Sequence, residues 1–234
     1  MELLRSCLSE WNIGIDRKQE DLFLRYYDLL IEWNNKINLT AITDKDDVII
    51  KHFTDSISIL KYINPAKKKI IDIGTGAGFP GIPIKIICPS CKVILLDSLN
   101  KRIGFLNEVI SSLGLSDIEC IHGRAEDIAK DSDHREKYDI AVSRAVSRLN
   151  ILSEYCLPFV NIDGLFISYK SGSIDEELEE ASGAVLKLGG SMGSVERFRL
   201  PNSDLERSLV IIKKTGHTMD KYPRKAGVPE RKPL

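Results

Sequence analysis

The chain has 234 residues, 43% of them hydrophobic and 29% charged, and a formal net charge of −1. A chain of this size buries one substantial core, so we expect one α/β domain with an appendage. No apolar run reaches the roughly 18 residues that a membrane span needs, and the first residues lack the apolar core of a signal peptide, so we expect a cytoplasmic protein. The near-zero net charge, taken by itself, argues against a nucleic-acid-binding protein.

The first 64 residues carry helical patterns. One face of a predicted helix over residues 18–37 is apolar, with Leu22, Tyr26, Leu29 and Trp33 at helical spacing. A second helix is predicted to open at Thr43, with Asp46 three residues later as its capping-box partner. We therefore expect residues 1–64 to form a helical cap ahead of a domain that covers residues 65–234.

A glycine-rich stretch over residues 69–81 follows this cap. A short run of β-forming residues ends in Asp72, and Gly74, Gly76 and Gly78 alternate after it. This pattern predicts a strand, a tight turn and a helix, because glycine accepts positive φ and lets backbone N–H groups approach a ligand. The stretch fits the dinucleotide pattern G-x-G-x-x-G and equally the first motif of S-adenosylmethionine (SAM) methyltransferases, so both cofactors stay open here.

Strands and helices alternate beyond the glycine stretch. Further strands are predicted over residues 93–96, 118–121, 138–142 and 165–169, with a closing hairpin pair over 195–200 and 209–212. Helices are predicted through Ile103 to Leu113, around 148–157 and over the acidic run 175–188. This alternation predicts a mostly parallel sheet covered by helices on both faces, with its ligand crevice at the carboxyl ends of the strands.

The five cysteines are scattered, as is typical of reduced thiols. Cys88-Pro-Ser-Cys91 has the spacing of a metal or redox pair, but the sequence offers no second pair to complete a zinc site. The pair also follows its predicted helix, whereas a redox pair is activated at a helix N-terminus. We expect no metal site.

Asp97 ends the second predicted strand, 19 residues after Gly78. A carboxylate at this place accepts the ribose hydroxyls of an adenosine, whether the cofactor is NAD or SAM. The stretch after the third strand, His122 to Asp127, puts a polar loop where the adenine edge lies in a methyltransferase. These residues extend the predicted cofactor site without choosing between the two cofactors.

The end of the fourth predicted strand reads Ser143-Arg144-Ala145. It lacks the Asn/Asp-Pro-Pro-aromatic motif of amino-methyltransferases, and the chain lacks a Pro-Cys nucleophile for pyrimidine C5. The methyl acceptor should then need neither deprotonation nor covalent activation, and guanine N7 is such an atom. Arg144 and Arg148, at the substrate end of the crevice, are predicted to bind phosphate or the guanine O6.

Basic residues are concentrated in the last part of the chain. From Arg197 to the end there are ten basic and four acidic side chains, which gives this segment a net charge of +6. A basic segment on a nearly neutral protein is typical of a protein with a polyanionic partner. We expect Arg224, Lys225, Arg231 and Lys232 to contact RNA.

At this point the chain resembles the bacterial methyltransferase G family of 16S ribosomal RNA, the glucose-inhibited division protein B group. The matching pieces run in order along nearly the whole chain: Trp33-Asn34 with Asn38-Leu39-Thr40, His52-Phe53-Thr54-Asp55-Ser56, Asp72 to Pro83, Leu96 to Arg102, Arg124-Ala125-Glu126, Ser143 to Val146, and Tyr222 to Leu234. Ser143 and Ser147 replace alanines of the family pattern, and its Lys-Gly after the fifth strand is here Lys170-Ser171-Gly172.

The resemblance implies a Rossmann-like, class I SAM-methyltransferase fold with an antiparallel final strand. It also implies methyl transfer from SAM to N7 of a guanine in 16S ribosomal RNA, within the small subunit, by a monomer. Carried over by motif, the SAM contacts are Gly74, Phe79, Ala125, Glu126 and Arg144, which join Gly76, Gly78 and Asp97 from the pattern of the loop and strand. Arg144 is the candidate catalytic residue, and Lys170 joins Arg148 and the basic tail as a candidate substrate contact.

Two other functions stay open on the sequence. An NAD(P)-dependent oxidoreductase would use the same loop and Asp97, although no Tyr/Lys or His proton relay is evident. A non-catalytic RNA-binding assembly factor would keep the basic tail and could dispense with Asp97 and the glycine loop.

Overall fold

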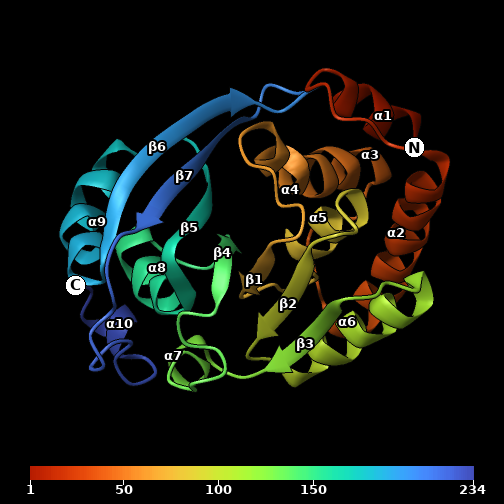
Figure 1. Cartoon of the computed structure of the whole chain (residues 1–234). Coiled ribbons are helices and arrows are strands. Elements are labelled where there is room, and N and C mark those ends of the chain that lie inside the picture. Colours follow the sequence, from red (N-terminus) through yellow and green to blue (C-terminus); the bar gives the residue numbers. More distant parts are fainter.

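A computed structural model describes all 234 residues and places one seven-stranded sheet at the centre of the molecule (Figure 1). The strands are β1 (Lys69–Ile73), β2 (Lys92–Asp97), β3 (Ile118–His122), β4 (Tyr138–Arg144), β5 (Val160–Ser171), β6 (Gly190–Arg199) and β7 (Glu206–Lys214). Their order across the sheet is β3-β2-β1-β4-β5-β7-β6. The first five strands are parallel, and β7 runs antiparallel to both β5 and β6. The expected α/β sheet with an antiparallel final strand is confirmed.

The N-terminal helices are more irregular than the sequence pattern predicts. They are α1 (Glu2–Ser9), α2 (Arg17–Ile37), α3 (Lys45–Val48), the π-helical turn η1 (Ile49–Thr54), α4 (Asp55–Ile57) and the 3-10 turn η2 (Ser58–Lys61). The predicted helix start at Thr43 is wrong by one residue. Asp44 is the N-cap, and its carboxylate accepts from the N–H groups of Asp46 and Asp47, each at 3.0 Å. A carboxylate that reaches two free N–H groups outcompetes the hydroxyl before it.

The remaining helices cover both faces of the sheet (Figure 1). They are α5 (Gly81–Ile87), α6 (Asn100–Leu113), α7 (Ala125–Ile128), α8 (Leu149–Cys156), the 3-10 turn η3 (Leu157–Phe159), α9 (Asp175–Lys187) and α10 (Val228–Arg231). None of the helices is long and apolar enough to cross a bilayer. No group of three or more His, Cys, Asp and Glu side chains is placed to hold a metal ion, and all five cysteines are free.

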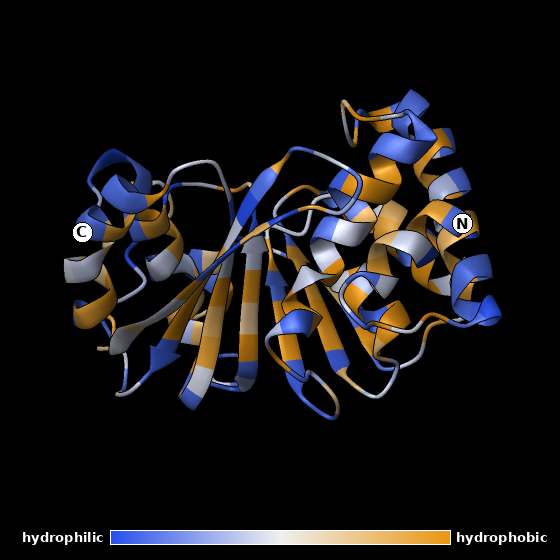
Figure 2. Ribbon diagram, turned by 90° about the horizontal axis from the view of Figure 1, so that it is seen from above, coloured by the Kyte–Doolittle hydropathy of each residue, from blue (hydrophilic) through white to orange (hydrophobic).

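Alternating strand residues feed two separate cores. Ile70, Val93 and Leu95 point to the face covered by α5, α6 and the N-terminal helices, where 29 buried residues form one cluster. Ile71 and Ile94 point to the opposite face, where α8 and α9 close a second cluster of 23 buried residues. Figure 2 shows the apolar residues concentrated along the central strands. A sheet buried on both faces needs near-continuous apolar strands, and Val93 to Leu96 of β2 supply such a run.

The N-terminal helices share their core with the sheet. Phe23, Tyr26 and Phe53 of the cap lie in the same cluster as the sheet residues Val142 and Ile167. Residues 1–64 therefore complete one face of the sheet, and they carry residues of η1 to the carboxyl end of β4.

Candidate functional site

The loop between β1 and α5 is fastened at both ends by Asp72. This fully buried carboxylate accepts from Thr75 Oγ1 at 2.6 Å and from the Gly81 N–H at 2.8 Å. Burial raises the pKa of Asp72 to about 7. Gly74 and Gly76 adopt left-handed φ values of 69° and 62°, so the tight turn depends on glycine at these positions.

Asp97, at the end of β2, holds the same loop from the other side. Its Oδ2 accepts from the Gly76 N–H at 2.9 Å and from Arg102 Nη1 at 3.2 Å, and its Oδ1 accepts from the Leu99 N–H at 2.9 Å. The side chain is 2% exposed. Asp97 therefore orders the glycine loop as well as facing the crevice.

A pocket of about 140 Å³ opens at the carboxyl ends of β1, β2 and β3, and we call it the cofactor pocket. Its lining residues are Ile73, Gly74, Leu96, Asp97, Ser98, Gly123, Arg124, Ala125, Glu126, Val146, Tyr155 and Glu230. Four of the predicted cofactor residues, Gly74, Asp97, Ala125 and Glu126, line this pocket together. The other four, Gly76, Gly78, Phe79 and Arg144, do not line it.

Two of those four residues, Gly78 and Phe79, pack in the core next to the glycine loop. A Cβ at Gly78 would lie 2.4 Å from Ile82 Cδ1 and 2.7 Å from the Tyr26 hydroxyl, so glycine is needed there for packing. Phe79 is 6% exposed and stacks against the ring of His52, with 4.6 Å between ring centroids. The Arg144 guanidinium lies 5.0 Å from the Phe79 ring centroid. Phe79 thus joins the glycine loop to Arg144 from within the core.

The cofactor pocket is anionic. Asp97, Glu126 and Glu230 line it, and Arg124 is its single basic lining residue. SAM carries an ammonium group, a sulfonium centre and one carboxylate, so its net charge of about +1 complements these acids. The pyrophosphate of NAD would meet the same carboxylates as like charges. These residues fit SAM better than a dinucleotide.

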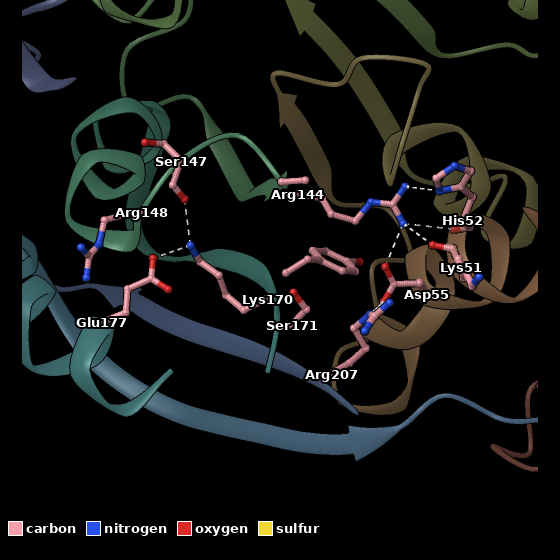
Figure 3. A pocket seen from close by; sticks show the side chains of 12 residues that line it. Lys51, His52, Asp55, Arg144, Ser147, Arg148, Lys170, Ser171, Glu177 and Arg207 are labelled. Atoms are coloured by element: carbon pink, nitrogen blue, oxygen red, sulfur yellow. Dashed lines mark hydrogen bonds and ion pairs between the residues drawn. The ribbon is translucent and has the colours of Figure 1, made fainter. Parts of the chain in front are cut away.

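A second, larger pocket of about 510 Å³ adjoins the first, and we call it the cationic pocket (Figure 3). It is lined by Lys51, His52, Asp55, Arg144, Ala145, Ser147, Arg148, Tyr169, Lys170, Ser171, Glu177 and Arg207. Five of these residues are basic and two are acidic, so the pocket suits an anionic ligand. The two pockets meet at the loop after β4, where Ala145 lines the cationic pocket and Val146 lines the cofactor pocket.

Arg144 is held by the N-terminal helices. Its Nη1 lies 2.9 Å from Asp55 Oδ2 and 3.2 Å from the carbonyl oxygen of Lys51, and its Nη2 lies 3.3 Å from His52 Nδ1 (Figure 3). Arg207 of β7 lies on the other oxygen of the same carboxylate, with Nε 3.4 Å from Asp55 Oδ1. The Asp55 side chain is only 6% exposed, so one buried acid orders two arginines from two strands.

His52 is neutral in this setting. Burial, and then the nearby Arg144 cation, lower the pKa of His52 to about 3. Because arginine can only donate, His52 Nδ1 accepts from Arg144, and Nε2 carries the hydrogen that faces Thr40 Oγ1 at 2.9 Å. His52 therefore orients Arg144, a residue of the cationic pocket.

The two other predicted substrate residues of this region line the opposite side of the cationic pocket. Lys170 lies 2.6 Å from Glu177 and donates to the Ser147 carbonyl oxygen at 2.8 Å. Arg148 pairs with Glu180 at 2.7 Å, and its side chain is 58% exposed. The structure therefore brings Arg144, Arg148 and Lys170 together.

The basic C-terminal segment is largely paired inside the protein. Six of its ten cations form ion pairs: Arg197, Arg199, Arg207, Lys213, Lys214 and Arg224. Arg224 forms a bidentate ion pair with Glu154, which is 1% exposed. The Nε–Oε1 distance is 2.9 Å and the Nη2–Oε2 distance is 2.6 Å. Arg224, which was predicted to contact RNA, thus also forms an ion pair within the protein. Lys225, Arg231 and Lys232 are exposed and form no ion pair.

Several residues of both pockets were not predicted from the sequence. Tyr155 and Glu230 line the cofactor pocket, and Glu177 and Arg207 line the cationic pocket. Asp55 belongs to one of the pieces that match the methyltransferase G family, which is the one signal that could have identified it. Glu230 belongs to another such piece, Tyr222 to Leu234. Tyr155, Glu177 and Arg207 come from α8, α9 and β7, far in sequence from the glycine loop, and no local pattern marks them.

An anionic pocket beside a glycine loop, in a sheet of this strand order, places the chain among the class I SAM-dependent methyltransferases. Solved structures with this fold include the ribosomal protein L11 methylase of Lactobacillus delbrueckii subsp. bulgaricus, with a TM-score of 0.54 and 17% identity over 71% of this chain and 79% of that one. Another is M. jannaschii TYW2 in complex with AdoMet, with a TM-score of 0.53 and 14% identity over 68% and 76% of the two chains.

The chain belongs to the rRNA small subunit methyltransferase G family, whose model matches residues 19–209. It is 53% identical to the ribosomal RNA small subunit methyltransferase G of Desulforamulus reducens, over 99% of this chain and 97% of that protein. The protein of the same name from Acetivibrio thermocellus is 52% identical over 100% and 96% of the two chains. The protein is therefore a SAM-dependent methyltransferase.

Proposed function

We propose that the protein transfers a methyl group from SAM to N7 of a guanine in 16S ribosomal RNA, within the small ribosomal subunit and as a monomer. The family and the names of its close relatives support a small-subunit RNA substrate. The cationic pocket supports an anionic polymer, because its five basic residues lie directly beside the cofactor pocket.

One observation carries the choice of N7: no side chain in the cationic pocket is poised to remove a proton. Asp55 lies between two arginines, and Glu177 is paired with Lys170. The pKa of His52 is about 3, so its imidazole is a very weak base. Guanine N7 has a free lone pair and no proton to lose, so alignment with the methyl donor is enough.

The residues then have distinct roles. Gly74, Asp97, Ala125 and Glu126 bind SAM, which supplies a methyl group on a sulfonium centre. Arg144, fixed by Asp55 and His52, binds the base edge or a phosphate oxygen. Arg148 and Lys170 bind the RNA backbone on the other side of the pocket.

The alternatives considered on the sequence fit less well. The acids of the cofactor pocket disfavour the pyrophosphate of NAD(P), and the cationic pocket offers no proton relay for an oxidoreductase. A non-catalytic RNA-binding factor would have no need of an ordered SAM loop. Calorimetric titration with SAM and with NADH separates these functions, and we expect heat of binding with SAM alone.

The direct test is to incubate the protein with SAM and small subunits from a strain that lacks the activity, then digest the RNA and identify the methylated nucleoside. We expect 7-methylguanosine from 16S RNA, and loss of the product with the Asp97→Ala variant. Methyl groups on adenine, on a ribose oxygen or on a pyrimidine would overturn the proposal. 7-Methylguanosine from large-subunit RNA alone would keep the chemistry and remove the proposed substrate.

A further inference from the structure

The C-terminal segment Arg224–Glu230 forms part of the wall of the cofactor pocket. Glu230, in α10, lines that pocket beside Tyr155 of α8. Figure 1 shows α10 close to α7 and α8, at the carboxyl ends of the strands. The segment therefore packs against the protein, whereas a free basic arm would extend into solvent.

Two contacts fasten the segment at this position. The Arg224 side chain and backbone N–H both donate to the buried carboxylate of Glu154. The Gly227 N–H donates to Glu126 Oε1 at 3.2 Å, and Glu126 itself lines the pocket. The segment is thus tied directly to a cofactor residue, and α10 begins at the residue after this tie.

The chain just before the segment is anchored as well. Arg135 donates from Nη1 to the Tyr222 carbonyl oxygen at 2.9 Å and from Nη2 to the Thr218 carbonyl oxygen at 2.7 Å. Tyr222 is 6% exposed and belongs to the second core. The backbone therefore reaches the cofactor pocket with little freedom to move away from it.

The segment also adds to the charge of the pocket. Burial, followed by the carboxylates of Glu126, Glu230 and Glu154, raises the pKa of Tyr155. Glu126 and Glu230 line the cofactor pocket together with Asp97. A third carboxylate increases the preference of the site for a ligand that is cationic and rich in hydrogen-bond donors.

We propose that the segment Arg224–Glu230 is a built-in wall of the SAM site, and that the Glu230 carboxylate contacts the bound cofactor. Arg224 is then a positioning residue, because it acts through the segment it fastens. This inference rests on the SAM pocket described above and is independent of which RNA base is methylated.

The first test measures SAM affinity by calorimetry in Glu230→Gln. This change keeps the shape of the side chain and removes its charge, and we expect the dissociation constant to rise about 3- to 10-fold, a moderate loss because Glu230 is partly solvated. The matched control is Glu179→Gln, an exposed acid of α9 that lines neither pocket, and it should bind SAM like the wild type. Equal affinity of Glu230→Gln and the control would overturn the contact.

The second test releases the segment without leaving a buried charge. In the double variant Glu154→Gln with Arg224→Met, we expect faster amide hydrogen exchange in residues 224–232 and weaker SAM binding. Faster exchange with unchanged SAM affinity would show that the segment is not part of the site. Failure of the wild type to bind SAM would instead contradict the cofactor assignment, and a wild type that binds SAM but methylates another base would leave this inference intact.

Discussion

At the scale of single residues, Asp55 and His52 decide how the cationic pocket is built. Asp55 faces two arginines, and its burial makes the carboxylate costly to keep without them. His52 accepts from Arg144 on one ring nitrogen and stacks on Phe79. Both residues come from the region of the π-helical turn η1, an irregularity that is frequent at functional sites.

The buried neutral His52 should make stability depend on pH. Its pKa is about 3 in the folded protein and about 6.5 when unfolded, so the unfolded state takes up the proton first and stability falls as pH drops below about 6.5. Between pH 6.5 and 5 we expect His52 to account for a loss of roughly 1.5 kcal/mol in the free energy of unfolding. Urea unfolding of His52→Gln should show a correspondingly shallower pH dependence than the wild type.

Asp72 also makes stability depend on pH, in the direction opposite to His52. Its raised pKa of about 7 makes the folded state hold the proton more tightly, so its contribution falls as pH rises from about 4 to 7. The Asp72 contribution to the free energy of unfolding is the same in wild type and His52→Gln, so it cancels in the comparison. As a control, His122→Gln, at an exposed histidine, should keep the wild-type dependence. An identical pH dependence in wild type and His52→Gln would contradict the buried neutral histidine.

Gly76 allows a matched test of the glycine loop. Gly76 and Gly114 have φ values of 62° and 61°, and a Cβ at either one meets no atom closer than 4.0 Å. Valine is therefore similarly strained at both positions, and each variant should lose roughly 1–3 kcal/mol of stability. Calorimetry should show at least about tenfold weaker SAM binding for Gly76→Val, because the Gly76 N–H donates to Asp97 of the cofactor pocket. Gly114→Val should bind SAM with wild-type affinity. Equal SAM affinity in the two folded variants would remove the loop from the cofactor site.

At the scale of elements, the glycine loop and the C-terminal segment both line the cofactor pocket, through Gly74 and Glu230. The loop is fixed by Asp72 and Asp97, and the segment is fixed by Glu154 and Glu126. Four carboxylates thus hold backbone or arginine donors around one site. Lys225, Arg231 and Lys232 remain exposed on the outside of this arrangement.

These three exposed cations should act on RNA and not on SAM. Changing Lys225, Arg231 and Lys232 together to Ala removes up to three phosphate contacts, so the slope of log affinity for RNA against log salt should flatten by up to about 0.7 per contact on single-stranded RNA. A control variant removes three exposed lysines that form no ion pair elsewhere: Lys92, Lys130 and Lys187. The two variants should bind SAM equally. The same salt dependence in both would assign the tail to solvated surface.

Local patterns predicted most elements and only part of the site. The apolar run Ile70-Ile71 is followed by Asp72 and then by alternating glycines, so strand, loop and helix could be derived from it. The role of Asp97 then follows from its place at the end of the second strand, whereas Gly74, Ala125 and Glu126 come from the resemblance to the methyltransferase G family. Glu230 and Arg207 could not be predicted, because their places depend on the ion pairs of Arg224 and Asp55, which form only in the folded chain.

At the scale of the whole molecule, the N-terminal helices and the sheet work as one unit. We propose that residues 1–64 are a cap on the catalytic domain of residues 65–234, because the cap closes one face of the sheet and delivers His52 and Asp55 to Arg144. The cap therefore supplies part of the substrate side, and the opposite end of the chain supplies part of the cofactor side.

We propose that the protein methylates guanine N7 by positioning alone. The most direct measurement is the single-turnover rate of 7-methylguanosine formation in small-subunit RNA, at saturating SAM, between pH 6.5 and 8.5. Because no general base has to lose a proton, we expect the rate to change by less than about threefold over this range. A rate that rises about tenfold per pH unit, or the absence of 7-methylguanosine among the products, would contradict the claim.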